Sequence, residues 1–193
     1  MMKRERIAKI VRAASVPPVW VALLLILVYA LRPGVFAGLG QMIAVLVCLA
    51  GVPLAAYPIA ALIPGLRRKG REGQRNLAFV MNLAGYVLAW GYALISGASQ
   101  GLRLIVWTYL ISVAVLTVLN KAVGLRASGH ACSIVGPMLL AVRLLGWGWA
   151  PPCAALLAAV VWSSLALKRH TPGELALGAA SALVSFAASV LIT

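Results

Sequence analysis

Seven apolar stretches, separated by short segments that hold most of the charge, dominate the chain. A helix that crosses a membrane needs about 20 mostly apolar residues, because in lipid its backbone groups must bond to one another. The pattern therefore predicts an all-α, polytopic transmembrane helix bundle of six or seven spans in a single domain. The stretches are 16–31, 35–63, 77–96, 102–119, 131–145, 151–167 and 175–193.

The second stretch is long for one span and contains Pro53 and Pro58. Proline breaks the hydrogen bonding of a helix interior, so a kink is expected there, or a broken start near Gly38 and Gly40. The stretches 16–31 and 131–145 are short, which leaves six and seven spans both open.

The formal charge of +14 would indicate nucleic-acid binding in a soluble protein. Here the basic residues form short clusters between apolar stretches, which favours membrane orientation and contact with anionic headgroups, with no nucleic-acid partner. In a seven-span arrangement with a cytoplasmic N-terminus, 14 of the 17 Lys and Arg residues lie inside, and only Arg32, Arg103 and Arg143 lie outside. This bias predicts a multi-pass protein of the cell membrane with a basic cytoplasmic tail at 1–15 and the bundle at 16–193.

Ionisable residues other than Lys and Arg are scarce: there is no Asp, and the chain has three Glu and two His. The turns around 67–76, 121–130 and 168–174 hold both histidines and Glu174, and they fall on one membrane face because a helical hairpin separates each pair. Ionisable groups at such helix ends are functional candidates. Cys48, Cys132 and Cys153 have no metal-binding or redox spacing and are interpreted as packing residues.

The local chemistry of these turns favours a phosphate ligand. Ser128 is a suitable N-cap for the following helix, and Gly129 allows close backbone approach, so free amides and the helix dipole would face an anion. Arginine side chains match phosphate oxygens in geometry and charge. A histidine beside them can attack phosphorus or protonate a leaving oxygen, which points to phosphoryl transfer.

Three segments carry a family resemblance. Ala-Ser-Gly-His at 127–130 is close to a Pro-Ser-Gly-His motif, and Ser-Ser, five residues, His, three residues, Glu at 163–174 is close to a motif with Ser-Arg and Asp in those places. A weaker match, at 68–76, is to Lys, six residues, Arg-Pro. Over about residues 64–185 the chain thus resembles the type 2 phosphatidic acid phosphatases, which share a core with vanadium haloperoxidases.

The resemblance implies a role for each matching residue. His170 would be the nucleophile, Glu174 would orient and charge it, and His130 would protonate the leaving alcohol. The phosphate would be held by Arg68, Arg75, Ser128 and Gly129. The motif arginine is replaced by Ser164, so one phosphate ligand is missing, and the candidates to replace it are Arg126, Lys168 and Arg169.

The sequence therefore predicts an enzyme, a membrane lipid phosphate phosphatase that hydrolyses a phosphomonoester or diphosphate of an isoprenoid or glycerolipid through a phosphohistidine, with no metal or cofactor. Its active face is expected to be cytoplasmic. An alternative is a non-catalytic lipid-binding or transport protein on the same scaffold, suggested by Ser164. The segment 171–174 also fits a simple helix capping box, so a structural role for Glu174 stays open.

Overall fold

The computed structural model describes the backbone of residues 2–193 and all of their side chains except those of residues 2, 3 and 71. Within this range the chain is helical apart from its connections, and no strand is present. The helices are α1 (Met2–Ala14), α2 (Pro17–Leu31), α3 (Leu39–Leu46), η1 (Val47–Gly51), α4 (Val52–Leu62), α5 (Pro64–Arg68), α6 (Gly70–Ile95), α7 (Gln100–Thr117), η2 (Val118–Ala122), α8 (Gly129–Leu145), η3 (Trp147–Trp149), α9 (Ala150–Ala166) and α10 (Pro172–Ile192).

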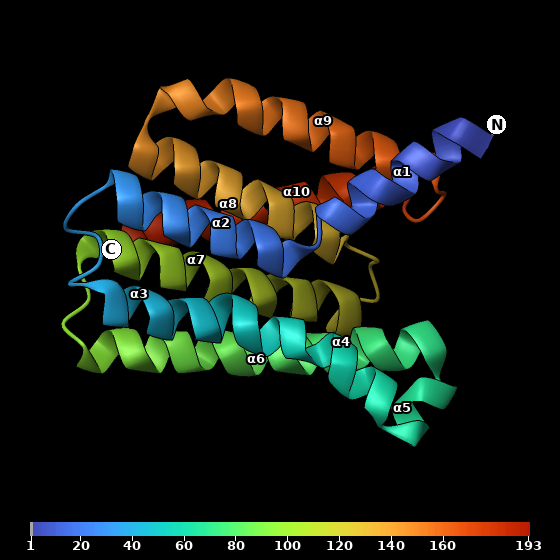
Figure 1. Ribbon diagram of the computed structural model, residues 1–193, viewed down its shortest axis with the longest axis horizontal. Coiled ribbons are helices and arrows are strands. Elements are labelled where there is room, and N and C mark those ends of the chain that lie inside the picture. The colour runs from blue at the N-terminus through green and yellow to red at the C-terminus, as the bar shows by residue number, and fades with distance from the viewer. Residues whose placement is uncertain (1) are drawn as a thin grey trace.

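Each predicted apolar stretch forms one pass through the bundle, and successive passes run in opposite directions (Figure 1). Within the described residues, five helices are long and apolar enough to cross a membrane, and α1 with α2 makes a sixth if this pair, bent by 52°, counts as one span. Helix α8 has 17 residues and is a shorter seventh pass. The predicted polytopic all-α membrane bundle is confirmed.

The second apolar stretch contains two irregularities. Its helical part begins only at Leu39, after a non-helical segment, so the start is broken as predicted. The backbone then widens into the π-helical turn η1 directly before Pro53. Proline has no N–H to donate and crowds the preceding turn, and a π turn changes the hydrogen-bonding register at that point. The unit α3–η1–α4 consequently passes through the bundle as one interrupted helix.

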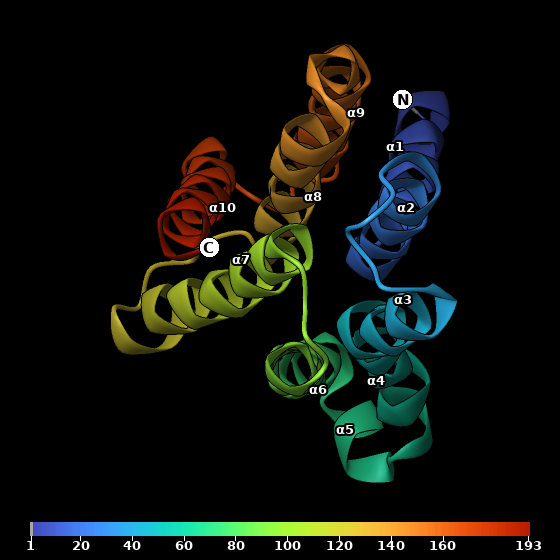
Figure 2. The ribbon, with the colours of Figure 1, turned by 90° about the vertical axis from the view of Figure 1, so that its left-hand side faces the viewer.

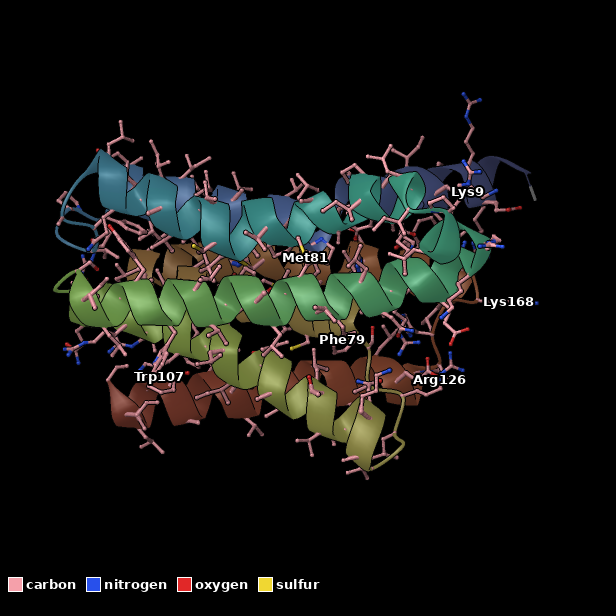
Figure 3. The ribbon with its side chains drawn as sticks, turned by 90° about the horizontal axis from the view of Figure 1, so that it is seen from below. Lys9, Phe79, Met81, Trp107, Arg126 and Lys168 are labelled. Carbon is pink, nitrogen blue, oxygen red and sulfur yellow. The ribbon has the colours of Figure 1, made fainter. Side chains whose placement is uncertain are left out.

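The three turns that carry the candidate residues lie at one end of the bundle. Figure 1 shows the N-terminus, α5 and the connections α7–α8 and α9–α10 at that end, which we call the motif end, with the C-terminus at the opposite end. Figure 3 places Lys9, Arg126 and Lys168 at the motif end and Trp107 toward the other. The predicted clustering of the turns on one face is therefore confirmed, although Lys3 and Arg71, which contribute to the basic bias, lie outside the described side chains.

The centre of the bundle is formed largely by α7 and α8, whose neighbours surround them in the end-on view of Figure 2. Leu102 and Ile105 on α7 and Leu140 on α8 are completely buried. By contrast, large apolar side chains on outer faces, such as Leu88 and Leu183, are more than half exposed. Apolar outer faces of this extent fit a lipid environment, because a soluble monomer rarely exposes such patches.

Helix α10 packs against α7 and α8 through a stripe of small residues. Gly178, Ser181, Ser185 and Ser189 are all buried, and each serine hydroxyl donates to the carbonyl oxygen four residues earlier on the same helix. Small side chains with internally satisfied hydroxyls let helix backbones approach closely in a membrane. The stripe brings α10 close enough to α8 to position the α9–α10 turn.

The basic segment assigned to a tail, residues 1–15, is structured over its described part, which begins at residue 2. Residues 2–14 form α1, which packs against α9 at the motif end. Ala8 and Ser15 are buried, whereas the basic residues Arg4, Arg6 and Lys9 are exposed. A helix with charges outward and small residues inward is typical of a segment lying on a protein and membrane surface.

We expect Gly85→Ala to lower the free energy of unfolding by about 1–3 kcal/mol, because a Cβ at this position of α6 would collide with the carbonyl oxygen of Cys48 in η1. Gly91→Ala, on the same helix with open space around it, should instead be neutral or stabilise by up to about 1 kcal/mol. Thermal unfolding of both variants in detergent measures the difference. Equal stability of the two would contradict the close packing of α6 on η1.

Candidate functional site

A cavity of about 640 Å³ extends from the motif end into the bundle. Its walls come from the α1–α2 junction, α4, α6, α7, α8 and the α9–α10 turn, so nearly every pass contributes. Both histidines of the chain line it, from α8 and from the α9–α10 turn. The charged and imidazole side chains at its surface are Arg12, Arg75, Arg126, Arg169, His130 and His170.

His170 is held by Glu174, one helical turn later. Its Nδ1 lies 2.9 Å from Oε2 of Glu174, and both side chains are largely shielded from solvent, with 24% and 16% exposure. An ionised carboxylate only accepts hydrogen bonds, so Nδ1 carries the proton in this pair. This contact fixes the orientation of the ring and leaves Nε2 as the nitrogen that can act on a ligand.

The same glutamate also caps α10. Glu174 accepts from the backbone N–H of Thr171 at 3.3 Å, and the Thr171 hydroxyl accepts from the N–H of Glu174 at 3.2 Å, which is a complete capping box. The preceding Pro172 occupies the first helical position, where its missing N–H has no consequence. The capping role and the contact with His170 therefore coexist, since one carboxylate oxygen serves both.

His130 enters the cavity from the first turn of α8. Its Nε2 lies 3.1 Å from the hydroxyl oxygen of Ser15, which joins the end of α1 to the start of α8. Arg12 and His170 lie close enough to interact electrostatically with the His130 ring. The two imidazoles thus share one cavity although they come from different helical hairpins.

The turns that carry the two histidines are joined through the backbone. The N–H of Ser128 donates to the carbonyl oxygen of Glu174 at 2.9 Å. Gly178, one turn further along α10, approaches the carbonyl oxygen of Ser128 so closely that any Cβ would collide with it. The start of α8 and the start of α10 are therefore fixed relative to one another.

Four of the seven predicted phosphate ligands line the cavity: Arg75, Arg126, Arg169 and Gly129. Ser128 is the predicted N-cap, because its hydroxyl accepts from the N–H of Ala131 at 3.2 Å, but it is completely buried and does not reach the cavity surface.

The structure does not bring Arg68 or Lys168 to the cavity. Both are exposed and neither belongs to the described residues that line it. Arg68 ends the short helix α5, which projects from the bundle (Figure 1). Lys168 follows the end of α9 with a φ of 50°, a left-handed conformation, and Figure 3 shows it at the extreme end of the molecule. Lys168 therefore belongs to the turn that ends α9.

Sequence reasoning missed Arg12 and Ser15, which lie in the segment assigned to the tail. Arg12 lines the cavity, and its Nη1 donates to the hydroxyl oxygen of Ser164 at 3.4 Å. Ser164 lies on α9 at the position where the family resemblance implied an arginine, and the guanidinium that contacts it comes from α1. No local pattern indicates this contact, because the two positions are 152 residues apart.

The electrostatics of the cavity favour an anion. Four guanidinium groups line it, and none of its described lining residues is Asp or Glu. Glu174 lies behind His170 and forms a 3.7 Å ion pair with Arg126, whose side chain is 73% exposed, so solvent weakens this pair. Deeper in the cavity, the buried Tyr109 hydroxyl has no hydrogen-bond partner among the described residues. A polar ligand or water would satisfy it.

Within the described residues, no group of three or more His, Cys, Asp or Glu side chains is arranged to hold a metal ion. Comparisons of the chain with family models, with curated proteins and with solved structures found no match.

We expect Thr171→Ala to lower the free energy of unfolding by about 1 kcal/mol, because one N-terminal amide of α10 loses its acceptor. Glu174→Ala should lower it further, since Thr171, His170 and Arg126 all lose a partner. Thr117→Ala, which removes a hydroxyl bonded to its own helix α7, is the matched control and should change stability by less than about 0.5 kcal/mol. Thermal unfolding in detergent tests this order, and a Glu174 variant as stable as the control would refute the multiple roles of the carboxylate.

Proposed function

We propose that the protein is a membrane lipid phosphate phosphatase that acts through a phosphohistidine. The observation that carries the proposal is the His170–Glu174 pair, with Nδ1 held at 2.9 Å, at the surface of a cationic cavity that also contains His130. An oriented imidazole, a second imidazole and several guanidinium groups are what phosphoryl transfer to histidine requires.

In the proposed reaction, Nε2 of His170 attacks phosphorus, and the bond between phosphorus and the lipid oxygen breaks. His130 gives a proton to that oxygen, so the lipid leaves as an alcohol, or as a monophosphate if the substrate is a diphosphate. His130, now deprotonated, takes a proton from a water molecule, whose oxygen attacks phosphorus; the bond between phosphorus and Nε2 breaks, inorganic phosphate leaves, and both histidines are restored. Glu174 stabilises the positive charge that develops on the His170 ring.

Arg75, Arg126 and Arg169 line the same cavity as His170, and so does Gly129, at the amide end of α8. These donors would neutralise the charge on the oxygens as the phosphoryl group is transferred. The resemblance of 127–130 and 163–174 to the type 2 phosphatidic acid phosphatases supports the same assignment of roles.

The substrate is proposed to be a phosphate or diphosphate carried by an isoprenoid or glycerolipid. The cavity lies within a bundle whose outer faces are apolar, so a ligand can place its phosphate among the arginines while its chain stays in lipid. The inward part of the cavity, lined by Tyr86, Tyr109 and Gly136, gives room for more than a bare phosphate.

The test is phosphate release by the purified protein from isoprenyl phosphate, isoprenyl diphosphate and phosphatidic acid in detergent. We expect turnover on at least one of them, and His170→Ala should reduce it by at least about 10³, since no other group can carry the covalent step. Lys168→Ala is the matched control, two residues away and outside the cavity, and should keep near wild-type turnover. Binding of these lipids without any phosphate release would favour the non-catalytic lipid-binding or transport alternative.

We further propose that the motif end faces the cytoplasm of the cell membrane, on the basis of the basic residues gathered there. Cysteine at Lys69, in a background lacking Cys48, Cys132 and Cys153, should resist an impermeant thiol reagent in intact cells and react after permeabilisation. Cysteine at Gly148, an exposed position at the opposite end, should react in intact cells. The reverse labelling pattern would invert the topology and direct the search for the substrate to the outer leaflet.

A further inference from the structure

The C-terminal end of helix α1 contributes to the wall of the cavity through Arg12. The helix packs against α9. Its last turn lies next to the cavity, just before the chain bends by 52° into α2. Ser15 is 1% exposed, and its hydroxyl lies 3.3 Å from the carbonyl oxygen of Arg12 and 3.1 Å from Nε2 of His130. This buried contact fixes the end of α1 against the start of α8.

The same turn carries Arg12 into the cavity. Its guanidinium lies 3.4 Å from the hydroxyl of Ser164, a completely buried residue of α9, and the side chain lines the cavity together with both histidines. Arg12 is also close enough to Tyr57 on α4 to interact with it electrostatically, and Tyr57 lines the same cavity. The guanidinium is thus held between α9 and α4, facing the ligand space.

This placement differs from that of the other basic residues of α1. Arg4, Arg6 and Lys9 are exposed, and Lys9 forms a 2.8 Å ion pair with Glu5 on the outer surface. A planar guanidinium at the wall of a cavity matches the oxygens of an oxyanion in geometry and charge. Among the α1 cations whose side chains the structure describes, Arg12 is the one that lines the cavity.

We propose that Arg12 is an oxyanion-binding residue of the cavity, and that it supplies from α1 the guanidinium that α9 lacks at Ser164. The identity of the anion as a lipid phosphate rests on the proposed function, but binding of phosphate by Arg12 does not. The site is consequently complete only when α1 is docked on α9.

Inorganic phosphate is the probe, and its binding to the full chain in detergent is measured as a rise in unfolding temperature against sodium chloride of equal ionic strength. Wild type and Arg6→Ala should show the same phosphate-dependent rise, because Arg6 is an exposed arginine of the same helix. Arg12→Ala should bind phosphate about tenfold more weakly or worse, as expected for the loss of one charged donor. No rise in the wild type, or an undiminished rise in Arg12→Ala, would overturn the proposal.

A second variant separates ligand binding from the docking of α1. In the Arg12→Ala background, Ser164→Arg places a guanidinium on α9 beside the space that Arg12 has vacated, and it should restore the phosphate-dependent rise. If this double variant does not fold, a low concentration of guanidinium chloride added to Arg12→Ala should restore the rise instead. A folded double variant without the rise, or no rescue by guanidinium, would mean that Arg12 only holds α1 in place.

These measurements need no turnover, so the two proposals fail separately. A protein that binds phosphate through Arg12 but releases none from any lipid would refute the phosphatase and leave the oxyanion site standing. If Arg12→Ala hydrolyses a lipid phosphate as fast as the wild type does, the oxyanion role of Arg12 is refuted and the phosphatase stands.

Discussion

The position of both imidazoles depends on the contact between the start of α8 and the first turns of α10. The Ser128 N–H bonds to the carbonyl oxygen of Glu174, and the absence of a side chain at Gly178 lets the Ser128 carbonyl oxygen lie directly against α10. His130 follows Ser128 by two residues, and His170 is bonded to Glu174. The backbone contact therefore sets how far apart the two chain segments that carry the rings lie.

Much of the fold could be predicted because each membrane-spanning helix needs about 20 consecutive apolar residues, and such a stretch is visible in the local sequence. Every apolar stretch became a pass, and the helix start at Leu39 lies between Gly38 and Gly40, near which a broken start was predicted. The π turn η1 was not predicted. Proline in an apolar stretch indicates an interruption of the helix, but it does not specify whether that interruption is a kink, a break or a π turn. The packing of α1 was not predicted either, since a run of basic residues is equally typical of a solvated tail.

The candidate site was predictable where neighbouring residues define it and not where distant ones do. The contact of His170 with Glu174 was implied by the family resemblance, and Ser128 was identifiable as an N-cap from its position before the helix. Arg68 was assigned from spacing alone, although its helix, α5, turns away from the bundle. The contact between Arg12 and Ser164 joins positions 152 residues apart, and no local pattern encodes such a pairing.

The bend after α1 also has a consequence for how the molecule is made. Arg12 and Ser15 leave the ribosome long before Ser164 and His130, their partners in the folded protein. Until α8 and α9 have entered the membrane, α1 has nothing to dock on, and a basic helix in that position remains at the headgroup surface. The cavity can therefore form only after the α9–α10 turn is in place, and in an incomplete chain the basic residues of α1 lie at the lipid headgroups and not at the wall of a cavity.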